Sequence, residues 1–123
     1  MSPRFESATV TELSRIGLLA TLPGETLTRL GREMRREELA PGTGVVSEGE
    51  PGERFYVVLS GLLSVSQADR GARRVLRPGD YFGEVALAMG VPRTASVRAL
   101  TPVTVASCDR GTFDEMIRPL FAD

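Results

Sequence analysis

The feature that most constrains the fold is the hydrophobic period of two that runs from about residue 37 to residue 108. In the run 55–60, Phe55, Val57 and Leu59 alternate with more polar or smaller neighbours, and 95–99 repeats the pattern. A strand has this period, whereas a helix repeats every 3.6 residues. Turn signals such as Arg77-Pro78-Gly79-Asp80 separate the runs. Short strands joined by glycine-rich turns predict a mainly β protein: an antiparallel sandwich, roll or barrel.

Helical periods flank this region. Residues 1–36 predict two helices, the first with a capping box of Thr9 and Glu12 and the second opened by Pro23. Residues 109–121 predict a C-terminal helix that Pro119 kinks or stops. The expected apolar faces are Val10, Leu13, Ile16 and Ala20 in the first helix, Leu27, Leu30 and Met34 in the second, and Phe113, Met116, Ile117, Leu120 and Phe121 in the last.

Length and composition remove several classes of function. A chain of 123 residues predicts one domain, 1–123. There is no histidine, no lysine and one cysteine, which excludes catalytic triads with a histidine base, His- or Cys-ligated metal sites and lysine-based phosphate loops. A net charge of −1 argues against a general nucleic-acid surface. We expect a non-enzyme without a metal ion, without membrane insertion and with a cytoplasmic location.

One segment, residues 80–96, breaks the strand rhythm and carries the chemistry. Glu84–Met89 are good helix formers between Gly83 and Gly90, so a short helix is expected there. The free N–H groups of its first turn suit an anion, and the planar fork of Arg93 can hold two phosphate oxygens. A carboxylate at Glu84 is useful beside a phosphate if it accepts a hydrogen bond from a sugar hydroxyl. These residues predict a site for a small sugar phosphate.

The same residues resemble a known family. Phe82-Gly83-Glu84-Val85-Ala86-Leu87, followed by Pro92-Arg93-Thr94-Ala95-Ser96-Val97, is similar to the phosphate-binding cassette of the cyclic nucleotide-binding domain family. Residues 46–52 and 55–61 resemble the early strands of that family. The resemblance covers residues 18–121. It implies an antiparallel, jelly-roll-like β-roll (37–108) with N-terminal helices (1–36), a cassette (82–96) with a short helix, and a C-terminal helix (109–121).

The resemblance also implies a role for each cassette residue. Arg93 would pair with the cyclic phosphate, and the backbone N–H groups of Gly83, Glu84, Val85 and Ala86, together with that of Ala95, would share it. Glu84 would also accept the ribose 2′-hydroxyl. Thr94 would contact a guanine base. Threonine at this position permits cGMP without demanding it. The base would rest on apolar side chains, with Val75 and Leu76 as the candidates.

The implied function is a regulatory module that binds cAMP, cGMP or both, needs no cofactor, and transmits occupancy to an attached or partner effector. A ligand-silent roll used for docking or homo-oligomerisation is the alternative. Family members usually continue into a further helix that closes over the base. We expect this lid to be absent from the chain, supplied by another domain or subunit, or lost by truncation.

Three other features carry ordinary structural expectations. Cys108 is expected to be a small buried hydrophobe. Arg35-Arg36 and Arg73-Arg74 are expected to be solvated charges.

Overall fold

The computed structural model describes residues 6–121, the side chain of residue 73 aside. Its N-terminal part contains β1 (Glu6–Ser7), α1 (Val10–Ser14), α2 (Gly24–Glu33), β2 (Arg35–Leu39) and β3 (Gly44–Val46). The middle contains β4 (Arg54–Ser60), β5 (Leu63–Gln67), β6 (Gly71–Leu76), β7 (Tyr81–Phe82) and α3 (Glu84–Met89). The last part contains β8 (Ser96–Ala99), β9 (Val103–Asp109) and α4 (Arg110–Thr112), continued by a π-helix (Phe113–Ile117) and a 3₁₀-helix (Arg118–Phe121).

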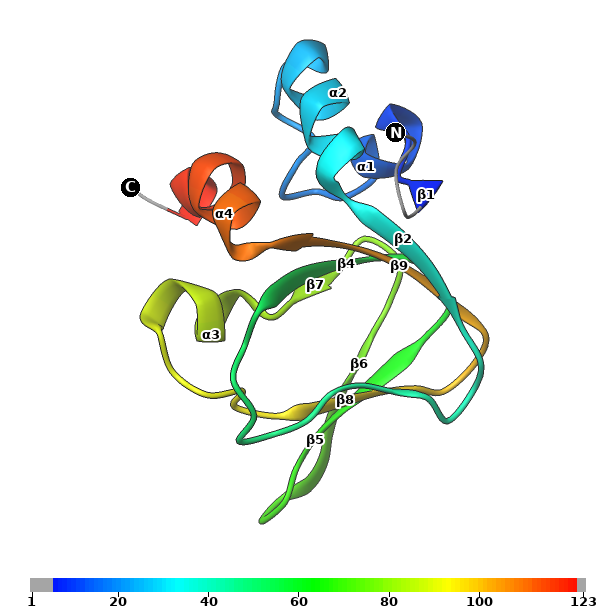
Figure 1. Ribbon diagram of the computed structural model, residues 1–123. Helices are drawn as coiled ribbons and strands as arrows, with labels where there is room; N and C mark the ends of the chain where they lie inside the picture. Colours follow the sequence, from blue (N-terminus) through cyan, green and yellow to red (C-terminus); the bar gives the residue numbers. More distant parts are fainter. Residues whose placement is uncertain (1–5, 122–123) are drawn as a thin grey trace.

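The strands form two antiparallel sheets that face each other (Figure 1). One has the order β1-β2-β9-β4-β7 and the other the order β3-β8-β5-β6. The helices of both ends lie on the outer side of the five-stranded sheet (Figure 1). This arrangement confirms the predicted β-roll with flanking helices. Among the helices of residues 6–121, none has the length and apolar character needed to span a bilayer.

Strand β4 is buried on both faces because it separates two hydrophobic cores. Phe55 and Val57 point outward and pack with α1, α2 and the C-terminal residues. Tyr56 and Val58 point inward and pack against the opposite sheet. Phe55 also joins an aromatic cluster, with its ring centroid 5.4 Å from that of Phe113 and 5.8 Å from that of Tyr81. The period of two along β4 therefore divides its side chains between the two cores.

The first predicted helix is wrong in its length. The capping box of Thr9 and Glu12 is present, but α1 ends at Ser14. Beyond it the chain makes successive turns in which a backbone N–H bonds to the carbonyl three residues earlier, as from Ile16 to Leu13 and from Leu19 to Ile16. A spacing of three matches the 3₁₀ geometry. It buries Leu19 in place of Ala20, which is exposed.

The arginine pair 35–36 is not a solvated surface but the start of strand β2, two residues before the expected beginning of the roll. Arg36 is held by carboxylates of the N-terminal segment: Nε lies 3.1 Å from Glu12 and Nη1 lies 2.8 Å from Glu6. Arg35 pairs with Glu37 two residues along the same strand. Ion pairs between β2 and its neighbours let a charged segment occupy an inner position of the sheet.

The helical segment 110–121 replaces the expected regular helix. Asp109 caps it by accepting a hydrogen bond from the Thr112 N–H at 2.9 Å. The middle is a π-helix, and the end continues past Pro119 as 3₁₀ to Phe121, so Pro119 does not stop it. As expected, Cys108 is fully buried at the base of this segment, and burial raises the pKa of its thiol to about 12.

Gly61 and Gly71 test how closely the two sheets are joined. Both have positive φ, +84° and +67°. A Cβ at Gly71 meets nothing within 4 Å, whereas a Cβ at Gly61 would lie 2.8 Å from Val103 Cα and against the Pro102 carbonyl. We expect Gly71→Ala to lower the free energy of unfolding by about 1–2 kcal/mol through backbone strain. Gly61→Ala should cost about 1–3 kcal/mol more because of the clash. Urea unfolding of both variants measures the difference, and equal costs would contradict the packing described here.

Candidate functional site

The centre of the site is the short helix α3. Gly83 before it and Gly90 after it have φ values of 96° and 64°, in the left-handed region that glycine enters without strain. The helix therefore begins and ends abruptly, as the sequence predicted. Among the residues that the structure describes, no side chain caps its N-terminus. The N–H groups of its first turn are consequently free to bind another acceptor.

All seven predicted site residues line one cavity of about 130 Å³ beside α3: Gly83, Glu84, Val85, Ala86, Arg93, Thr94 and Ala95. The first four come from the start of α3 and the last three from the chain that leads into β8. Residues ten positions apart are thus brought to a common surface. Their assignment as ligand contacts stays a prediction.

Arg93 is the unusual member, because only 7% of its surface is exposed. Its guanidinium donates hydrogen bonds to two backbone carbonyls, from Nη2 to Arg54 O at 2.9 Å and from Nη1 to Gly83 O at 3.3 Å. Within residues 6–121, no carboxylate forms an ion pair with it. Burial lowers its pKa, an effect opposed by the negative charges of Glu53 and Glu84. A cation with this burial and without a paired carboxylate favours an anionic ligand.

The backbone of Arg93 is held as firmly as its side chain. Its N–H donates to the carbonyl of Glu50 and its carbonyl accepts from the N–H of Gly49, both at 2.8 Å. The next residue is also fixed, because the Thr94 carbonyl accepts a hydrogen bond from Gln67 Nε2 at 3.0 Å. The side chain of Thr94 remains exposed at the rim of the cavity.

Glu84 lies at the first position of α3 and is half-buried. Its carboxylate acts on Arg93 through charge without forming an ion pair with it. The cavity thus presents a guanidinium and free N–H groups beside one carboxylate acceptor. This combination can bind a group that carries a negative charge next to a hydroxyl donor.

Sequence reasoning missed five residues that line the cavity. Four are apolar and one is charged: Val46, Val65, Phe82, Val97 and Arg74. The two expected base contacts are not among them, since Leu76 is fully buried between the sheets and Val75 is 40% exposed outside the cavity. In strand β6 it is Arg74, and neither Val75 nor Leu76, that lines the cavity. The pairing of β5 with β6, in which Val65 lies opposite Arg74, decides this placement, and the alternation within β6 alone does not reveal it.

No group of three His, Cys, Asp or Glu side chains in the described part of the chain could hold a metal ion. The polar groups around the cavity are the side chains of Arg74, Arg93, Glu84 and Thr94, together with backbone N–H groups. Recognition of an organic anion is the chemistry that these groups can perform.

Comparison with protein families agrees with this geometry. The family described as the cyclic nucleotide-binding domain matches residues 36–119. The chain belongs to the cyclic nucleotide-binding domain family. The resemblance carried by residues 82–97 is therefore confirmed.

Curated relatives place the domain within larger proteins. The chain is 37% identical over 107 residues to a cAMP-dependent protein kinase regulatory subunit of Debaryomyces hansenii, and 36% identical over 109 residues to one of Yarrowia lipolytica. These matches cover 87% and 88% of the chain but only 24% and 29% of the relatives. The chain thus spans about a quarter of their length.

Solved structures share the architecture of this cyclic nucleotide-binding domain. The regulatory domain of Toxoplasma gondii protein kinase A, crystallised with cAMP, has a TM-score of 0.85 at 26% identity, covering 90% of this chain and 44% of that one. The regulatory subunit of a cAMP-independent protein kinase A from Trypanosoma brucei has a TM-score of 0.86, also at 26% identity, covering 90% and 41%. Neighbours of both kinds exist, so the architecture alone does not decide the ligand.

Gly52 gives a test of how tightly the cassette is packed. A Cβ there would collide with that of Ala86 and lie 3.3 Å from Cζ and Nε of Arg93. We expect Gly52→Ala to push α3 away from the loop and to lower the free energy of unfolding by about 1–3 kcal/mol. Gly44→Ala is the matched control, because a Cβ at Gly44 meets nothing within 4 Å. Thermal unfolding of both variants should show a lower Tm for Gly52→Ala, and an equal Tm would be evidence against this packing.

Proposed function

We propose that this domain is a regulatory module that binds a 3′,5′-cyclic purine nucleotide, accepting both cAMP and cGMP, and transmits its occupancy to an effector protein or domain. The observation that carries the proposal is the buried guanidinium of Arg93, which borders the cavity and has no paired carboxylate among residues 6–121. A cyclic phosphate supplies one negative charge, which would compensate the positive charge of Arg93.

The phosphate would lie between Arg93 and the start of α3. Two N–H groups of Arg93 are engaged by carbonyls, which orient the guanidinium and leave its other donors for the ligand. The N–H groups of Glu84, Val85 and Ala86 belong to the first helical turn and have no intrahelical acceptor. Preorganised donors of this kind bind an anion without a further ordering cost.

The ribose and the base would occupy the remaining walls. Glu84 would accept the 2′-hydroxyl, which gives its carboxylate a partner beside the phosphate. The apolar side chains of Val46, Val65 and Val97 offer a surface on which a flat purine can rest. Thr94 and Arg74 add hydrogen-bond donors at the rim, and such donors can reach the acceptors of a guanine.

We propose a binding role without catalysis. The named relatives are regulatory subunits of a kinase. Cys108, the only cysteine, is fully buried, and burial raises the pKa of its thiol to about 12, so it is a poor nucleophile. The effector is proposed as a separate protein or domain, since the chain matches only about a quarter of each relative.

Arg93→Ala tests the binding function directly. Hydrogen bonds to a charged group contribute ~1.5–3 kcal/mol each, and ~1.4 kcal/mol is tenfold in affinity. Loss of two such bonds should weaken cAMP and cGMP binding by about 100-fold or more. Isothermal titration calorimetry on protein stripped of carried-over nucleotide measures this, with a stoichiometry of about one nucleotide per chain expected for the parent.

Two further variants protect this test. Arg98→Ala removes an exposed arginine of β8 and should bind as the parent does. Glu84→Gln keeps the size of the side chain and should weaken binding without removing the charge of Arg93. A parent that gives no heat and no competition with a fluorescent analogue would refute the proposal. A stable oligomer in light scattering would then favour the docking function.

Arg74 should influence the choice of base. Arginine pairs in bidentate fashion with guanine O6 and N7, whereas glutamine pairs with adenine N6 and N7. Arg74→Gln should therefore shift the ratio of cGMP to cAMP affinities by about tenfold toward cAMP, the effect of one such pair. Calorimetry with both nucleotides measures the ratio, and Arg98→Gln is the matched control. An unchanged ratio would mean that Arg74 does not contact the base.

A further inference from the structure

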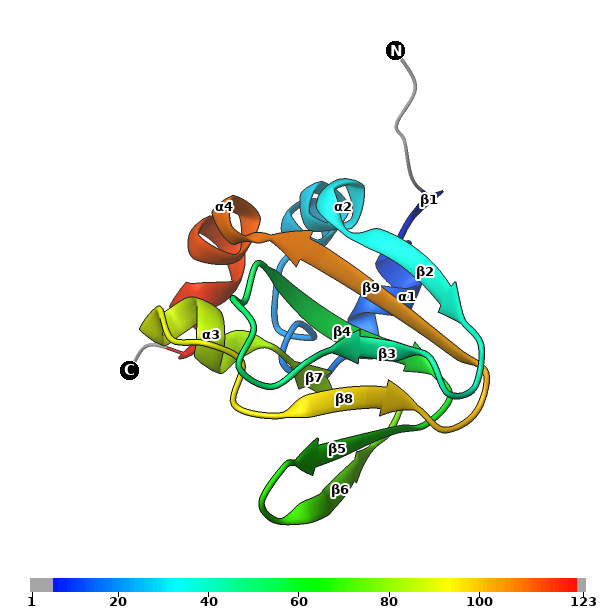
Figure 2. The same ribbon diagram turned by 60° about the horizontal axis from the view of Figure 1, so that its bottom comes forward.

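The peptide group that joins Thr94 to Ala95 lies where the pairing of two strands stops. Strand β8 pairs with β5 as far as Ser96 opposite Ser66, and the register ends there. Figure 2 shows the end of β5 beside the beginning of β8, where the chain arrives from α3. Thr94 and Ala95 lie just before this point and line the cavity. Their common peptide group therefore lacks the ladder hydrogen bonds that would fix its orientation.

The side chain of Gln67, the last residue of β5, supplies a hydrogen bond in place of the ladder. Its Nε2 donates to the Thr94 carbonyl at 3.0 Å. This peptide bond is trans and planar, so its N–H points in the direction opposite to its C=O. The N–H of Ala95 is therefore directed away from Gln67. Gln67 does not line the cavity, whereas Thr94 and Ala95 do.

The Ala95 N–H is available to a ligand. Within residues 6–121, neither a backbone nor a side-chain acceptor forms a hydrogen bond with it. A carbonyl that accepts a hydrogen bond also polarises its peptide group, which strengthens the N–H on the other side as a donor. The contact with Gln67 thus orients this N–H and increases its strength at the same time.

The backbone that carries Gln67 is itself fixed to the chain it positions. The N–H of Ala68, the next residue, donates to a carboxylate oxygen of Glu48 at 2.8 Å. The backbone N–H of Glu48 in turn donates to Ser96 Oγ at 2.9 Å. The end of β5, the chain at Glu48 and the start of β8 are therefore tied together around the Thr94 carbonyl.

We propose that Gln67 is a positioning residue for the ligand: by holding the Thr94 carbonyl, it turns the Ala95 N–H into the cavity to donate to the phosphate. This inference rests on the proposed nucleotide-binding function and adds to the phosphate site a residue from outside the cassette. A cyclic phosphate has two exocyclic oxygens, and a single N–H reaches one of them. Loss of Gln67 therefore weakens the contact with one exocyclic oxygen more than the contact with the other.

Gln67→Met tests this proposal, because methionine has a similar length but no N–H donor. The probes are cAMP and the two diastereomers of its phosphorothioate, in each of which sulfur replaces one exocyclic oxygen. Sulfur accepts hydrogen bonds weakly, as it does in cysteine and methionine. Gln67→Met should weaken the binding of cAMP and of one diastereomer by about fivefold, the effect of one net hydrogen bond. Binding of the diastereomer whose sulfur faces Ala95 should change much less.

Isothermal titration calorimetry on nucleotide-free protein measures the three affinities. A merely structural role of Gln67 would lower all three by the same factor, so the selectivity between the diastereomers is the decisive quantity. Gln67→Glu keeps the size of the side chain, but its carboxylate cannot donate, so it should change this selectivity in the same direction. Gln67→Lys restores a donor and should recover part of the parent's selectivity.

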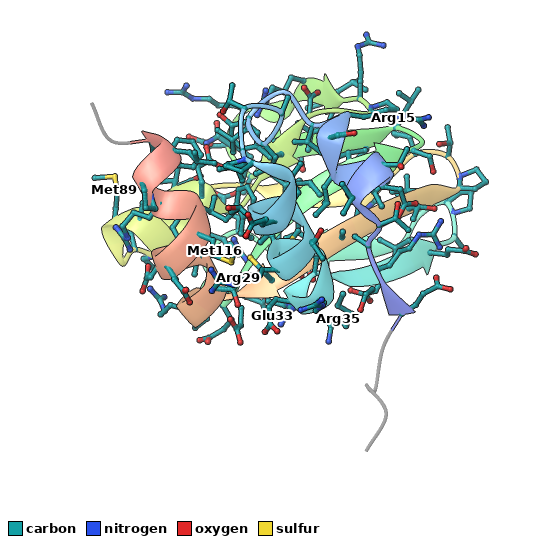
Figure 3. The ribbon with its side chains drawn as sticks, turned by 90° about the horizontal axis from the view of Figure 1, so that it is seen from above. Arg15, Arg29, Glu33, Arg35, Met89 and Met116 are labelled. Atoms are coloured by element: carbon teal, nitrogen blue, oxygen red, sulfur yellow. The ribbon has the colours of Figure 1, made fainter. Side chains whose placement is uncertain are left out.

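Two control variants change side chains that do not line the cavity. Ser64→Ala lies on β5 with Gln67, and Met89→Ala lies on α3. The Met89 side chain is 72% exposed and points away from the molecule (Figure 3). Both variants should bind the three nucleotides as the parent does.

The outcomes separate this inference from the function on which it rests. If the parent binds cAMP while Gln67→Met and Gln67→Glu keep the parent's selectivity between the diastereomers, the role of Gln67 is refuted and nucleotide binding stands. If the parent binds none of the three nucleotides, the proposed function fails, and the role of Gln67 fails with it.

Discussion

The structure around the cavity depends on the burial of one guanidinium, that of Arg93, whose partners in the described part of the chain are carbonyls and not an ion-paired carboxylate. Two backbone carbonyls, of Arg54 and Gly83, hold Arg93 in place without neutralising it. Burying a charge is costly unless an opposite charge compensates it. The geometry requires glycine at positions 52 and 83, because a Cβ at either position would press on the Arg93 side chain. The burial of Arg93 therefore costs local stability, and a bound anion can neutralise its positive charge.

The two cores explain how such a site can be tolerated. The inner core around Val58 and Leu76 holds together the sheets that carry the apolar walls of the cavity. The outer core around Phe55 contains Leu87 of α3 together with residues of α1, α2 and the segment 113–117. Strand β4 contributes to both, and its first residue, Arg54, supplies a carbonyl to Arg93. The side chain of Arg54 is anchored in turn to Ser107 of β9, from Nε to Oγ at 2.8 Å. The paired strands β4 and β9 therefore hold the carbonyl of Arg54 that fixes the Arg93 guanidinium.

Local signals predicted the parts of the site that depend on local chemistry. Gly83 and Gly90 mark the two ends of α3 because glycine adopts the left-handed backbone conformation there. The presence of glycine at these positions is visible directly in the sequence. Arg74 was missed because its position depends on pairing with β5, and a one-residue slip in register reverses the face of every side chain. The charges of β2 were misassigned for a similar reason, since the partners of Arg36 lie at Glu6 and Glu12, far along the chain. The register between neighbouring strands and the contacts between distant segments are what the pattern lacks.

The sequence contains no lysine, so arginine is the cation in all of these contacts. Arg54, Arg93, Arg110 and Arg118 all donate to backbone carbonyls around the cassette, and the last three each reach two different carbonyls. A planar guanidinium can do this because its donors diverge in a fixed geometry, whereas an ammonium acts as a point charge. Arginine here joins segments of the chain through their backbone carbonyls. It follows that the position of the cassette backbone depends on these guanidinium groups as well as on the buried side chains of α3, Ala86 and Leu87.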